Sequence, residues 1–227
     1  MILIPVKNLS NAKQRLASVL DQSARTELAH AMLLDVVDAV VRYGKQRVAL
    51  VTNDPFALEL AEEHGFEVIR DDANVSETEA IDMATRVCQS RGVESTLVIP
   101  GDIPLIEAAE LSAIYDASPS AGTVFVPSRD KRGTNAVLRR PAALFPLRFG
   151  NDSFIPHLAA AAATNSMIVV LPLAGIGLDI DTPEDLYELA ASPGEKRSQT
   201  LARSLGFGNS SDPSQAETEG SLTSAES

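Results

Sequence analysis

The 227-residue sequence predicts an α/β fold, a mixed and mostly parallel sheet flanked by helices. Short apolar runs rich in Val and Ile recur along the chain, and most are followed by a segment whose apolar residues have helical spacing. This alternation is typical of the strand–helix–strand units that build a parallel sheet. The run 97–99 (Leu-Val-Ile) is apolar on both faces, which favours a strand buried in the middle of such a sheet.

The elements follow in order along the chain. Strands are expected at residues 2–6, 47–52, 66–69, 95–99 and 123–126, in a run that follows Gly133, and at 167–171. Helices are expected at residues 23–42, 55–64, about 76–88, 107–115 and 155–163, and from Thr182 onward. Gly44 and Gly65 end two of the helices, while Asp54 and Ser76 stand at N-cap positions.

A single domain is expected over residues 1–191. From Ser192 onward Ser, Gly, Glu, Thr and Pro dominate, and only a weak apolar stripe (Leu201, Leu205) survives. Residues 192–227 are therefore expected to form a mostly disordered tail, above all after about Gly208, because they bury too little apolar surface to order themselves.

The amino-acid composition limits the classes of function that the chain can have. Hydrophobic residues make up 44% and charged residues 22% of the chain, as in an ordinary globular protein, and the formal net charge is −12. Without a dense Lys/Arg run, binding to nucleic acid or an anionic membrane surface is not expected. The one cysteine, Cys88, lies on an apolar helix stripe and is expected to be a small buried hydrophobe. No signal peptide or spanning apolar run is apparent, so a cytoplasmic location is expected.

The central strand stops at Pro100-Gly101-Asp102. In an open α/β sheet, ligands bind just beyond the carboxyl ends of the strands. Asp102 is therefore well placed to hold a metal ion on a phosphate. The alternative is that it only caps the helix that begins near Glu107.

The loop after the first strand carries three basic side chains, Lys7, Lys13 and Arg15. In this position of an α/β sheet, such a loop is where a nucleotide triphosphate lies. It contains no glycine and is therefore not a Walker loop. A solvated loop with scattered charges is the alternative.

Asp179 and Asp181 alternate along an extended segment, so both carboxylates point the same way while Leu178 and Ile180 point into the fold. Two carboxylates on one side repel each other unless a positive charge lies between them. Carboxylate and phosphate oxygens are the ligands that Mg²⁺ demands. Asp102, Asp179 and Asp181 are therefore expected to form a magnesium site.

Two loops in the second half of the chain carry small and polar residues. Residues 127–135 form a basic loop broken by Gly133, in which Arg129, Lys131 or Arg132 is a candidate to meet a carboxylate. In the turn 149–154, Ser153 is expected either to cap the next helix or to help bind an anion with the freed amides. His157 follows one helical turn later and is expected to face the same pocket.

Five blocks of sequence resemble the family of 2-phospho-L-lactate and phosphoenolpyruvate guanylyltransferases, which act in biosynthesis of the deazaflavin coenzyme F-420. The blocks are Ile-Pro-Val-Lys…Ala-Lys-Gln-Arg-Leu at 4–16, Pro-Gly-Asp-Ile-Pro-Leu at 100–105, Pro-Ser-Arg-Asp-Lys-Arg-Gly-Thr-Asn at 127–135, Phe-Gly-Asn-Asp-Ser-Phe-Ile-Pro-His at 149–157 and Leu-Asp-Ile-Asp-Thr-Pro-Glu-Asp-Leu at 178–186. They stand in the family's order and span about residues 1–190. The resemblance implies a single-domain nucleotidyltransferase fold, similar to the nucleotide-diphospho-sugar transferases, that requires GTP and Mg²⁺.

The resemblance also implies roles for individual residues. Residues matching Asp102, Asp179 and Asp181 bind the metal, and residues matching Thr134, Gly150 and Ser153 hold the phosphorylated acid. We expect Lys7, Lys13 and Arg15 to bind the nucleotide and Lys13 and Asp102 to be catalytic. The partners implied are GTP and a small phosphorylated carboxylic acid, with a homodimer as a possible assembly.

One block departs from the family. Where a Gly-Leu-Asn start to the helix after the third strand is usual, this chain has Val75-Ser76-Glu77-Thr78-Glu79. The departure favours 3-phosphoglycerate slightly over phosphoenolpyruvate, with 2-phospholactate as the third candidate. The alternatives are a nucleotidyltransferase of the same fold that acts on a sugar phosphate or molybdopterin, and a non-catalytic nucleotide-binding protein. A molybdopterin enzyme is expected to carry a glycine-rich first loop, which this chain lacks.

Overall fold

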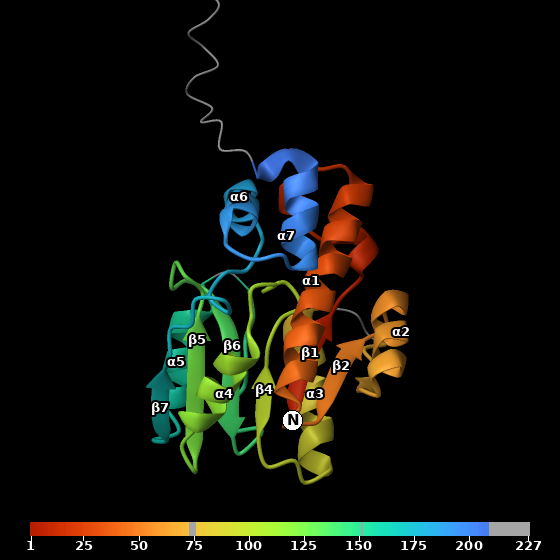
Figure 1. Cartoon of the computed structure of the whole chain (residues 1–227). Helices are drawn as coiled ribbons and strands as arrows, with labels where there is room; N and C mark the ends of the chain where they lie inside the picture. The colour runs from red at the N-terminus through yellow and green to blue at the C-terminus, as the bar shows by residue number, and fades with distance from the viewer. Residues whose placement is uncertain (73–75, 151, 209–227) are drawn as a thin grey trace, which may run out of the picture.

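The computed structural model describes residues 1–72, 76–150 and 152–208. In this part of the chain, seven strands form one sheet in the order β3-β2-β1-β4-β6-β5-β7 (Figure 1). The strands are β1 (Ile2–Val6), β2 (Val48–Thr52), β3 (Glu67–Ile69), β4 (Thr96–Val98), β5 (Gly122–Pro127), β6 (Thr134–Arg140) and β7 (Met167–Val170).

Neighbouring strands run parallel except where β6 lies. β6 pairs antiparallel with β4 and with β5, while β1, β2, β3 and β4 pair parallel and so do β5 and β7. The sheet is thus mixed and mostly parallel, and the predicted fold class is confirmed. Because of the reversal, the first residues of β6 lie at the same edge of the sheet as the carboxyl ends of β4 and β5.

Helices cover both faces of the sheet. They are α1 (Gln22–Tyr43), α2 (Pro55–His64), α3 (Glu77–Ser90), α4 (Ala108–Asp116), α5 (Phe154–Ala162), α6 (Pro183–Ala191) and α7 (Arg197–Ala202), with short helical turns at Leu9–Asn11, Gln14–Leu16 and Arg203–Phe207. The apolar sides of α1, α2 and α4 pack on one face and those of α3 and α5 on the other. Most strand residues are buried, as continuous apolar runs require.

A third apolar cluster lies above the carboxyl ends of the strands. Here the first half of α1 packs against α6 and α7, and Leu178 and Ile180 contribute to the same cluster (Figure 1). Burial of these two side chains turns the alternating Asp179 and Asp181 to the other side of the segment, as the sequence predicts.

The folded domain extends beyond the predicted boundary at residue 191. Residues 197–207 form α7 and a helical turn that pack on α1 and α6, and Ala202 and Phe207 are buried there. The buried Asp35 of α1 accepts hydrogen bonds from the Ser198 backbone N–H (2.9 Å) and hydroxyl (2.6 Å) at the start of α7. The sequence missed this contact because a residue distant in the chain supplies both the cap and the apolar surface. The disorder predicted after Gly208 lies outside the described residues.

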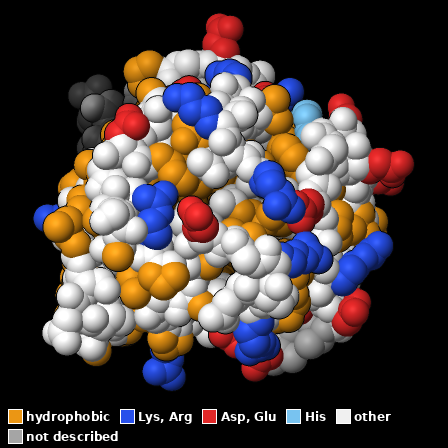
Figure 2. All heavy atoms as spheres, turned by 90° about the horizontal axis from the view of Figure 1, so that it is seen from below, with side chains coloured by type: hydrophobic (Ala, Val, Ile, Leu, Met, Phe, Trp, Pro, Cys, Tyr) orange, Lys and Arg blue, Asp and Glu red, His pale blue; other side chains and the backbone are white. Residues whose placement is uncertain are grey.

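Several local expectations are confirmed. The Asp54 carboxylate caps α2 by accepting from the Ala57 N–H, and the Ser76 hydroxyl caps α3 by accepting from the Glu79 N–H. Cys88 is buried. No helix among the described residues is long and apolar enough to cross a membrane. Figure 2 views the molecule from the amino ends of the strands, where basic side chains stand singly among acidic and apolar ones.

Candidate functional site

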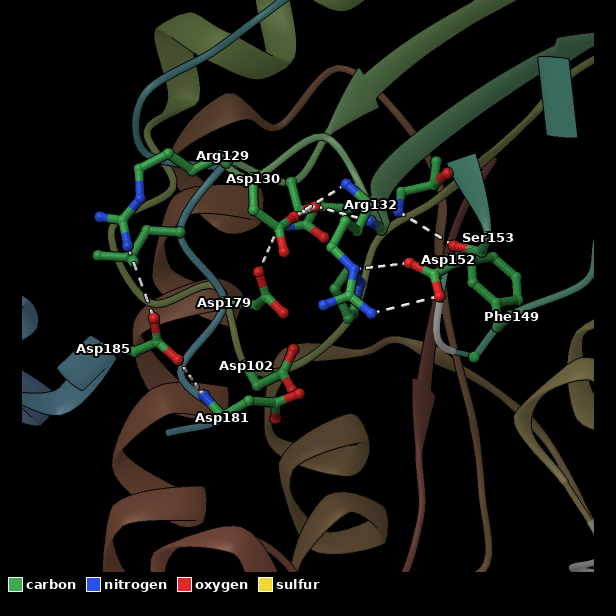
Figure 3. Close-up of a pocket in the computed structure, with 18 of the residues that line it drawn as sticks. Asp102, Arg129, Asp130, Arg132, Phe149, Asp152, Ser153, Asp179, Asp181 and Asp185 are labelled. Atoms are coloured by element: carbon green, nitrogen blue, oxygen red, sulfur yellow. Dashed lines mark hydrogen bonds and ion pairs between the residues drawn. The ribbon is translucent and has the colours of Figure 1, made fainter. Parts of the chain in front are cut away.

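A cavity of about 690 Å³ opens at the carboxyl edge of the sheet (Figure 3). It brings together residues from six segments: the loop after β1, the start of α3, the end of β4, the loop between β5 and β6, the turn before α5, and the segment before and into α6. Its lining includes Arg15, Glu77, Asp102, Arg129, Arg132, Thr134, Asn135, Gly150, Asp152, Ser153, Asp179, Asp181 and Asp185. A second cavity of about 490 Å³ opens beside the ends of β1, β2 and β3, with Lys7, Asn53 and Asp71 in its lining.

One wall of the larger cavity is acidic. The backbone joins Asp102 to the segment of the other two aspartates, because the Ile180 N–H donates to the Asp102 carbonyl oxygen at 3.1 Å. Asp102 does not cap α4, whose N-cap is Glu107. The alternative structural role for Asp102 is therefore absent, and its carboxylate faces the cavity with those of Asp179 and Asp181 (Figure 3).

Lys13 bridges two of these carboxylates. Its Nζ donates to Asp102 Oδ2 at 2.6 Å and to Asp181 Oδ1 at 3.0 Å, and the ammonium is nearly buried. Burial by itself lowers the pKa of Lys13, but the two carboxylates outweigh it and raise the pKa above its usual value. Burial also raises the pKa of Asp181, yet Lys13 and Arg15 reverse this and hold it below its usual value. The pair is therefore ionised at neutral pH.

Asp179 stands apart from the lysine. Its Oδ1 accepts a hydrogen bond from Asn135 Nδ2 at 3.0 Å, and Asn135 also donates to the Ile176 carbonyl oxygen. Burial raises the pKa of Asp179, and the neighbouring Asp102 and Asp181 add to the rise against the hydrogen bond from Asn135. A cation beside this carboxylate would relieve both effects.

The acidic wall is not a closed metal cage. Among the described residues, no group of three or more His, Cys, Asp or Glu side chains is arranged so that it could hold a metal ion. The Lys13 ammonium lies between Asp102 and Asp181. All three aspartates predicted to bind the metal nevertheless line one cavity.

Sequence reasoning missed Glu77. This residue follows the Ser76 cap, which accounts for an acidic residue there by the helix dipole alone. In the structure Glu77 also lines the cavity, and burial raises its pKa to about 7, with Asp102 adding and Lys13 and Lys7 opposing. The signal was the departure of this block from the family pattern, although Val75 of that block lies outside the described residues.

The three basic residues of the first loop diverge in space. Lys13 bridges the aspartates, Arg15 lies at the rim of the larger cavity 3.2 Å from Asp181, and Lys7 lines the second cavity 2.7 Å from Asp71. Two contacts hold this loop on the domain: the Leu16 side chain is buried, and the backbone N–H of the partly buried Leu9 donates to Asp54 Oδ2 at 2.8 Å. The loop therefore runs from one cavity to the other.

The opposite wall is neutral and carries hydroxyl groups. Ser153 does not cap α5 with its side chain; its Oγ accepts instead from the Thr134 N–H at 3.1 Å. Both side chains belong to buried residues that line the cavity. Gly150 also lines it, and its φ of +129° is a conformation that residues with a side chain rarely adopt. The structure thus brings together all three residues predicted to hold the acid.

His157 lies behind this wall. It is buried on α5, and its ring is stacked on Phe125 and in edge contact with Phe149. Its Nε2 is 2.8 Å from the Arg148 N–H, and its Nδ1 is 3.0 Å from Thr134 Oγ1. Burial lowers the pKa of His157 to about 4, and the charge of Arg139 acts in the same direction. The expectation that His157 faces the pocket is therefore wrong, because its ring is buried behind Thr134 and does not line the cavity.

Two of the three basic candidates of the loop 127–135 line the cavity. Arg132 pairs with Asp152 at 2.6 Å across its mouth, and Arg129 contacts Asp185 and Glu188 of α6 (Figure 3). Lys131 is absent from the lining and its backbone is left-handed (φ 60°). The candidates for a carboxylate are therefore Arg129 and Arg132.

Comparison with known proteins places the chain in a family. Residues 1–221 match the family model described as guanylyl transferase, CofC like. This chain belongs to that family. A phosphoenolpyruvate guanylyltransferase of Rubrobacter xylanophilus is 37% identical over 85% of this chain and 94% of its own length. A 2-phospho-L-lactate guanylyltransferase of Methanothermobacter thermautotrophicus is 32% identical over 90% of each chain. The resemblance drawn from the five sequence blocks is confirmed, as is the enzyme class of nucleotidyltransferase.

Solved structures agree on the fold. A protein of Desulfovibrio desulfuricans G20, named after the nucleotide-diphospho-sugar transferases, superposes with a TM-score of 0.72 at 17% identity, over 89% of this chain and 93% of its own. A nucleotidyl transferase of a Methanothermobacter species gives a TM-score of 0.59 at 15% identity, over 89% and 97%. At such identities the likeness concerns the fold alone, and it confirms the predicted nucleotidyltransferase architecture.

Proposed function

We propose that this chain joins the GMP moiety of GTP to the phosphate of a small phosphorylated three-carbon acid and releases pyrophosphate, as a step of coenzyme F-420 biosynthesis. The observation that carries the proposal is the division of one cavity into two walls. One wall gathers three carboxylates and a buried ammonium, and the other presents two buried hydroxyl groups. The names of the relatives from Rubrobacter and Methanothermobacter support guanylyl transfer to a phosphorylated acid.

The reaction is an in-line displacement. A phosphate oxygen of the acid attacks the α-phosphorus of GTP, a new P–O bond forms, and the bond to the β-phosphate breaks with its electron pair leaving on pyrophosphate. A phosphate is already an anion near neutral pH, so no side chain has to remove a proton from it. The protein contributes positioning and charge neutralisation. Lys13 and Arg15 are placed to contact the triphosphate beside Asp181.

The residues of the acidic wall fit Mg²⁺. Their donors are all carboxylate oxygens, and burial together with Asp102 and Asp181 raises the pKa of Asp179, an effect that a bound cation would offset. Mg²⁺ is usually held by one or two carboxylates together with substrate phosphates and waters, so an open set suits it better than a complete cage. Asp102, Asp179 and Asp181 would hold the ion. When bound, it supplies positive charge between two phosphates that otherwise repel each other.

The two cavities suggest how GTP lies. The first loop runs from Lys7 at the second cavity to Arg15 at the larger one, so one short segment borders both cavities. A triphosphate along Lys13 and Arg15 directs the base toward the second cavity. There Asp71 offers a carboxylate that can accept from the N–H donors of guanine.

The acid then occupies the neutral wall. Thr134, Ser153 and the open space at Gly150 suit one phosphate and one carboxylate on three carbons, with Arg132 at the mouth as a partner for the negative charge. Glu77 adds a polar group that can bond to a further hydroxyl. Because a site built to bond a hydroxyl discriminates against analogues without it, we favour 3-phosphoglycerate over phosphoenolpyruvate and 2-phospholactate.

Pyrophosphate release over a grid of substrates tests the proposal. The grid crosses GTP, ATP, CTP and UTP with the three acids, a hexose 1-phosphate and no acceptor, each with and without Mg²⁺. The expected result is release that needs Mg²⁺, GTP and one of the acids. A sugar phosphate as best acceptor, or release with no acceptor, contradicts it. Asp116→Asn is a matched control for substitutions of the cavity aspartates, because this carboxylate is exposed at the end of α4 and absent from the lining of both cavities.

A further inference from the structure

The side chain of His157 reaches the candidate acceptor site through two residues that line it, by a polar contact with Thr134 and a ring contact with Phe149. The ring is buried to 1% exposure and does not line the cavity. Packing against Phe125 and Phe149 holds its plane, and two polar contacts occupy its two nitrogens. The proposed transfer needs no histidine as an acid or a base. The burial of His157 beside the site therefore indicates another role.

The backbone fixes the tautomer of this histidine. The Arg148 N–H points at Nε2 across 2.8 Å, so Nε2 accepts a hydrogen bond and carries no proton. A neutral imidazole has one proton, which must then reside on Nδ1. Nδ1–H faces Thr134 Oγ1 at 3.0 Å and donates to it. The pKa of about 4 that burial imposes keeps the ring neutral at physiological pH.

The direction of that bond determines what Thr134 can offer. The hydroxyl oxygen already accepts from His157, so the hydroxyl proton is free to donate to another group. Because Thr134 lines the cavity, that donor is available to an acceptor atom there. Ser153 is set in the same way, since its oxygen accepts from the Thr134 N–H and its own proton remains to be donated. Two hydroxyl donors with fixed polarity thus lie on one wall.

We propose that His157 is a positioning residue that fixes the Thr134 hydroxyl as a hydrogen-bond donor to the phosphorylated acid, which makes the neutral wall selective for anionic oxygens. This inference rests on the proposed function and goes beyond it, because it names the group that sets the polarity of the acceptor site. Without the Nδ1–H donor, the threonine proton is free to turn toward position 157, and the wall loses one of its two donors. The cost falls on binding of the acid and leaves GTP untouched.

A pair of substitutions separates the polarity of the bond from the bulk of the ring. His157→Asn keeps an N–H donor near the position of Nδ1, whereas His157→Gln places its amide near Nε2 and loses that donor. We expect His157→Gln to raise the KM for the acid about 10-fold, with the KM for GTP within about twofold of wild type, as for the loss of one hydrogen bond to a charged group. His157→Asn should restore most of the difference. Equal effects of the two variants, or a rise in the KM for GTP, overturn the proposal.

A double-mutant cycle then tests whether His157 acts through Thr134. In a chain that carries Thr134→Val, no hydroxyl remains to be oriented, so adding His157→Gln should change the KM for the acid by less than about twofold. A purely structural role predicts that the two effects multiply, which would refute the positioning role. The cycle compares the wild type, the two single variants and the double variant. Their melting temperatures should lie within a few degrees of one another.

A measurement without turnover keeps this inference separate from the proposed function. Nitrogen-15 NMR of the imidazole at pH 7 should show His157 in the Nδ1–H tautomer, and phosphoenolpyruvate or 3-phosphoglycerate alone should shift the Thr134 and Ser153 amide signals. If no acid supports guanylyl transfer yet both results hold, the proposed function fails and the polarity of the wall stands. An Nε2–H tautomer overturns the inference whatever the activity.

Discussion

The two walls of the larger cavity differ in their charge and in how their polar groups are paired. The acidic wall is charged and partly open, and its aspartates are unequally neutralised, since Lys13 pairs with Asp102 and Asp181 while Asp179 accepts from the neutral amide of Asn135. The neutral wall is buried and has its polar groups paired within the protein, each hydroxyl oxygen accepting one bond. The acidic wall needs added positive charge before it can bind phosphates. The neutral wall presents hydroxyl donors that contacts within the protein already orient.

From this difference we infer that one wall stabilises charge during the reaction and that the other selects the acid. Negative charge on the phosphates is best met by fixed positive charge, which the acidic wall would supply through Lys13 and a Mg²⁺ ion held by its aspartates. Choice among small acids is best made by buried donors of fixed direction, which is the property of the neutral wall. Substitutions on the acidic wall should therefore lower kcat, and those on the neutral wall should raise the KM for the acid.

The largest expected effect is on the acidic wall. Replacing Asp102, Asp179 or Asp181 by Asn keeps volume and removes charge, so kcat should fall by roughly 10²-fold or more while the chain still folds. Steady-state rates and circular dichroism of each variant measure this. Wild-type turnover in both Asp179→Asn and Asp181→Asn would refute the magnesium assignment.

The next effect is on the neutral wall. Ser153→Ala and Thr134→Val each remove one donor, so the KM for the acid should rise about 10-fold while the KM for GTP and kcat change little. Steady-state kinetics with each substrate varied in turn measure kcat and the two KM values. If GTP binding weakens instead, the acid and the nucleotide have been assigned to the wrong walls. Thr200→Val is a useful control because this residue is exposed on α7 and lines neither cavity.

A third effect concerns stability and pH. The pKa of His157 is about 4 in the folded chain, against about 6.5 for an unperturbed histidine. Between these values the unfolded chain binds a proton that the folded chain does not, so stability falls as the pH drops from 6.5 toward 4. At pH 5.5 the loss is on the order of 1 kcal/mol. Urea unfolding at pH 7.5 and 5.5 should show it in wild type and less of it in His157→Asn; identical pH dependence in both chains speaks against a buried neutral ring.

Truncation gives the smallest effect and tests what supports the acidic wall. Removing residues 209–227 should leave activity and melting temperature nearly unchanged, as the polar composition of that segment predicts. Removing residues 197–227 takes away α7 and Phe207, which share an apolar cluster with Leu178 and Ile180 beside the aspartates. The longer deletion should lower the melting temperature by many degrees. A similar fall after the shorter deletion would show that the last residues dock on the domain.

The sequence predicted the helices and strands better than the contacts between residues that lie far apart in the chain. Apolar runs and caps such as Asp54 located strands and helices to within a few residues, because these signals are local. The three aspartates and Ser153 were also singled out from their places beside strand or helix ends at one edge of the sheet, whereas Thr134 and Gly150 came from the resemblance to the family alone. Alternation along a short segment sufficed to predict that Asp179 and Asp181 share a side.

What the sequence did not predict depends on contacts between distant residues. The bridge from Lys13 to Asp102 and Asp181 spans 89 and 168 positions, and no spacing rule encodes it. The docking of α7 depends in the same way on Asp35, 163 positions before Ser198. Ser153 had two local interpretations, cap or ligand, and the structure removes the first because its hydroxyl faces Thr134.

The central claim is that the two walls bring a nucleotide and a phosphorylated acid together for guanylyl transfer. Phosphorus-31 NMR of a reaction containing this chain, GTP, Mg²⁺ and 3-phosphoglycerate tests it most directly, with phosphoenolpyruvate and 2-phospholactate run in parallel. The account predicts free pyrophosphate and a new pair of coupled signals from a diphosphate bridge that joins GMP to one of the acids. Release of inorganic phosphate or GMP without such a pair would contradict it.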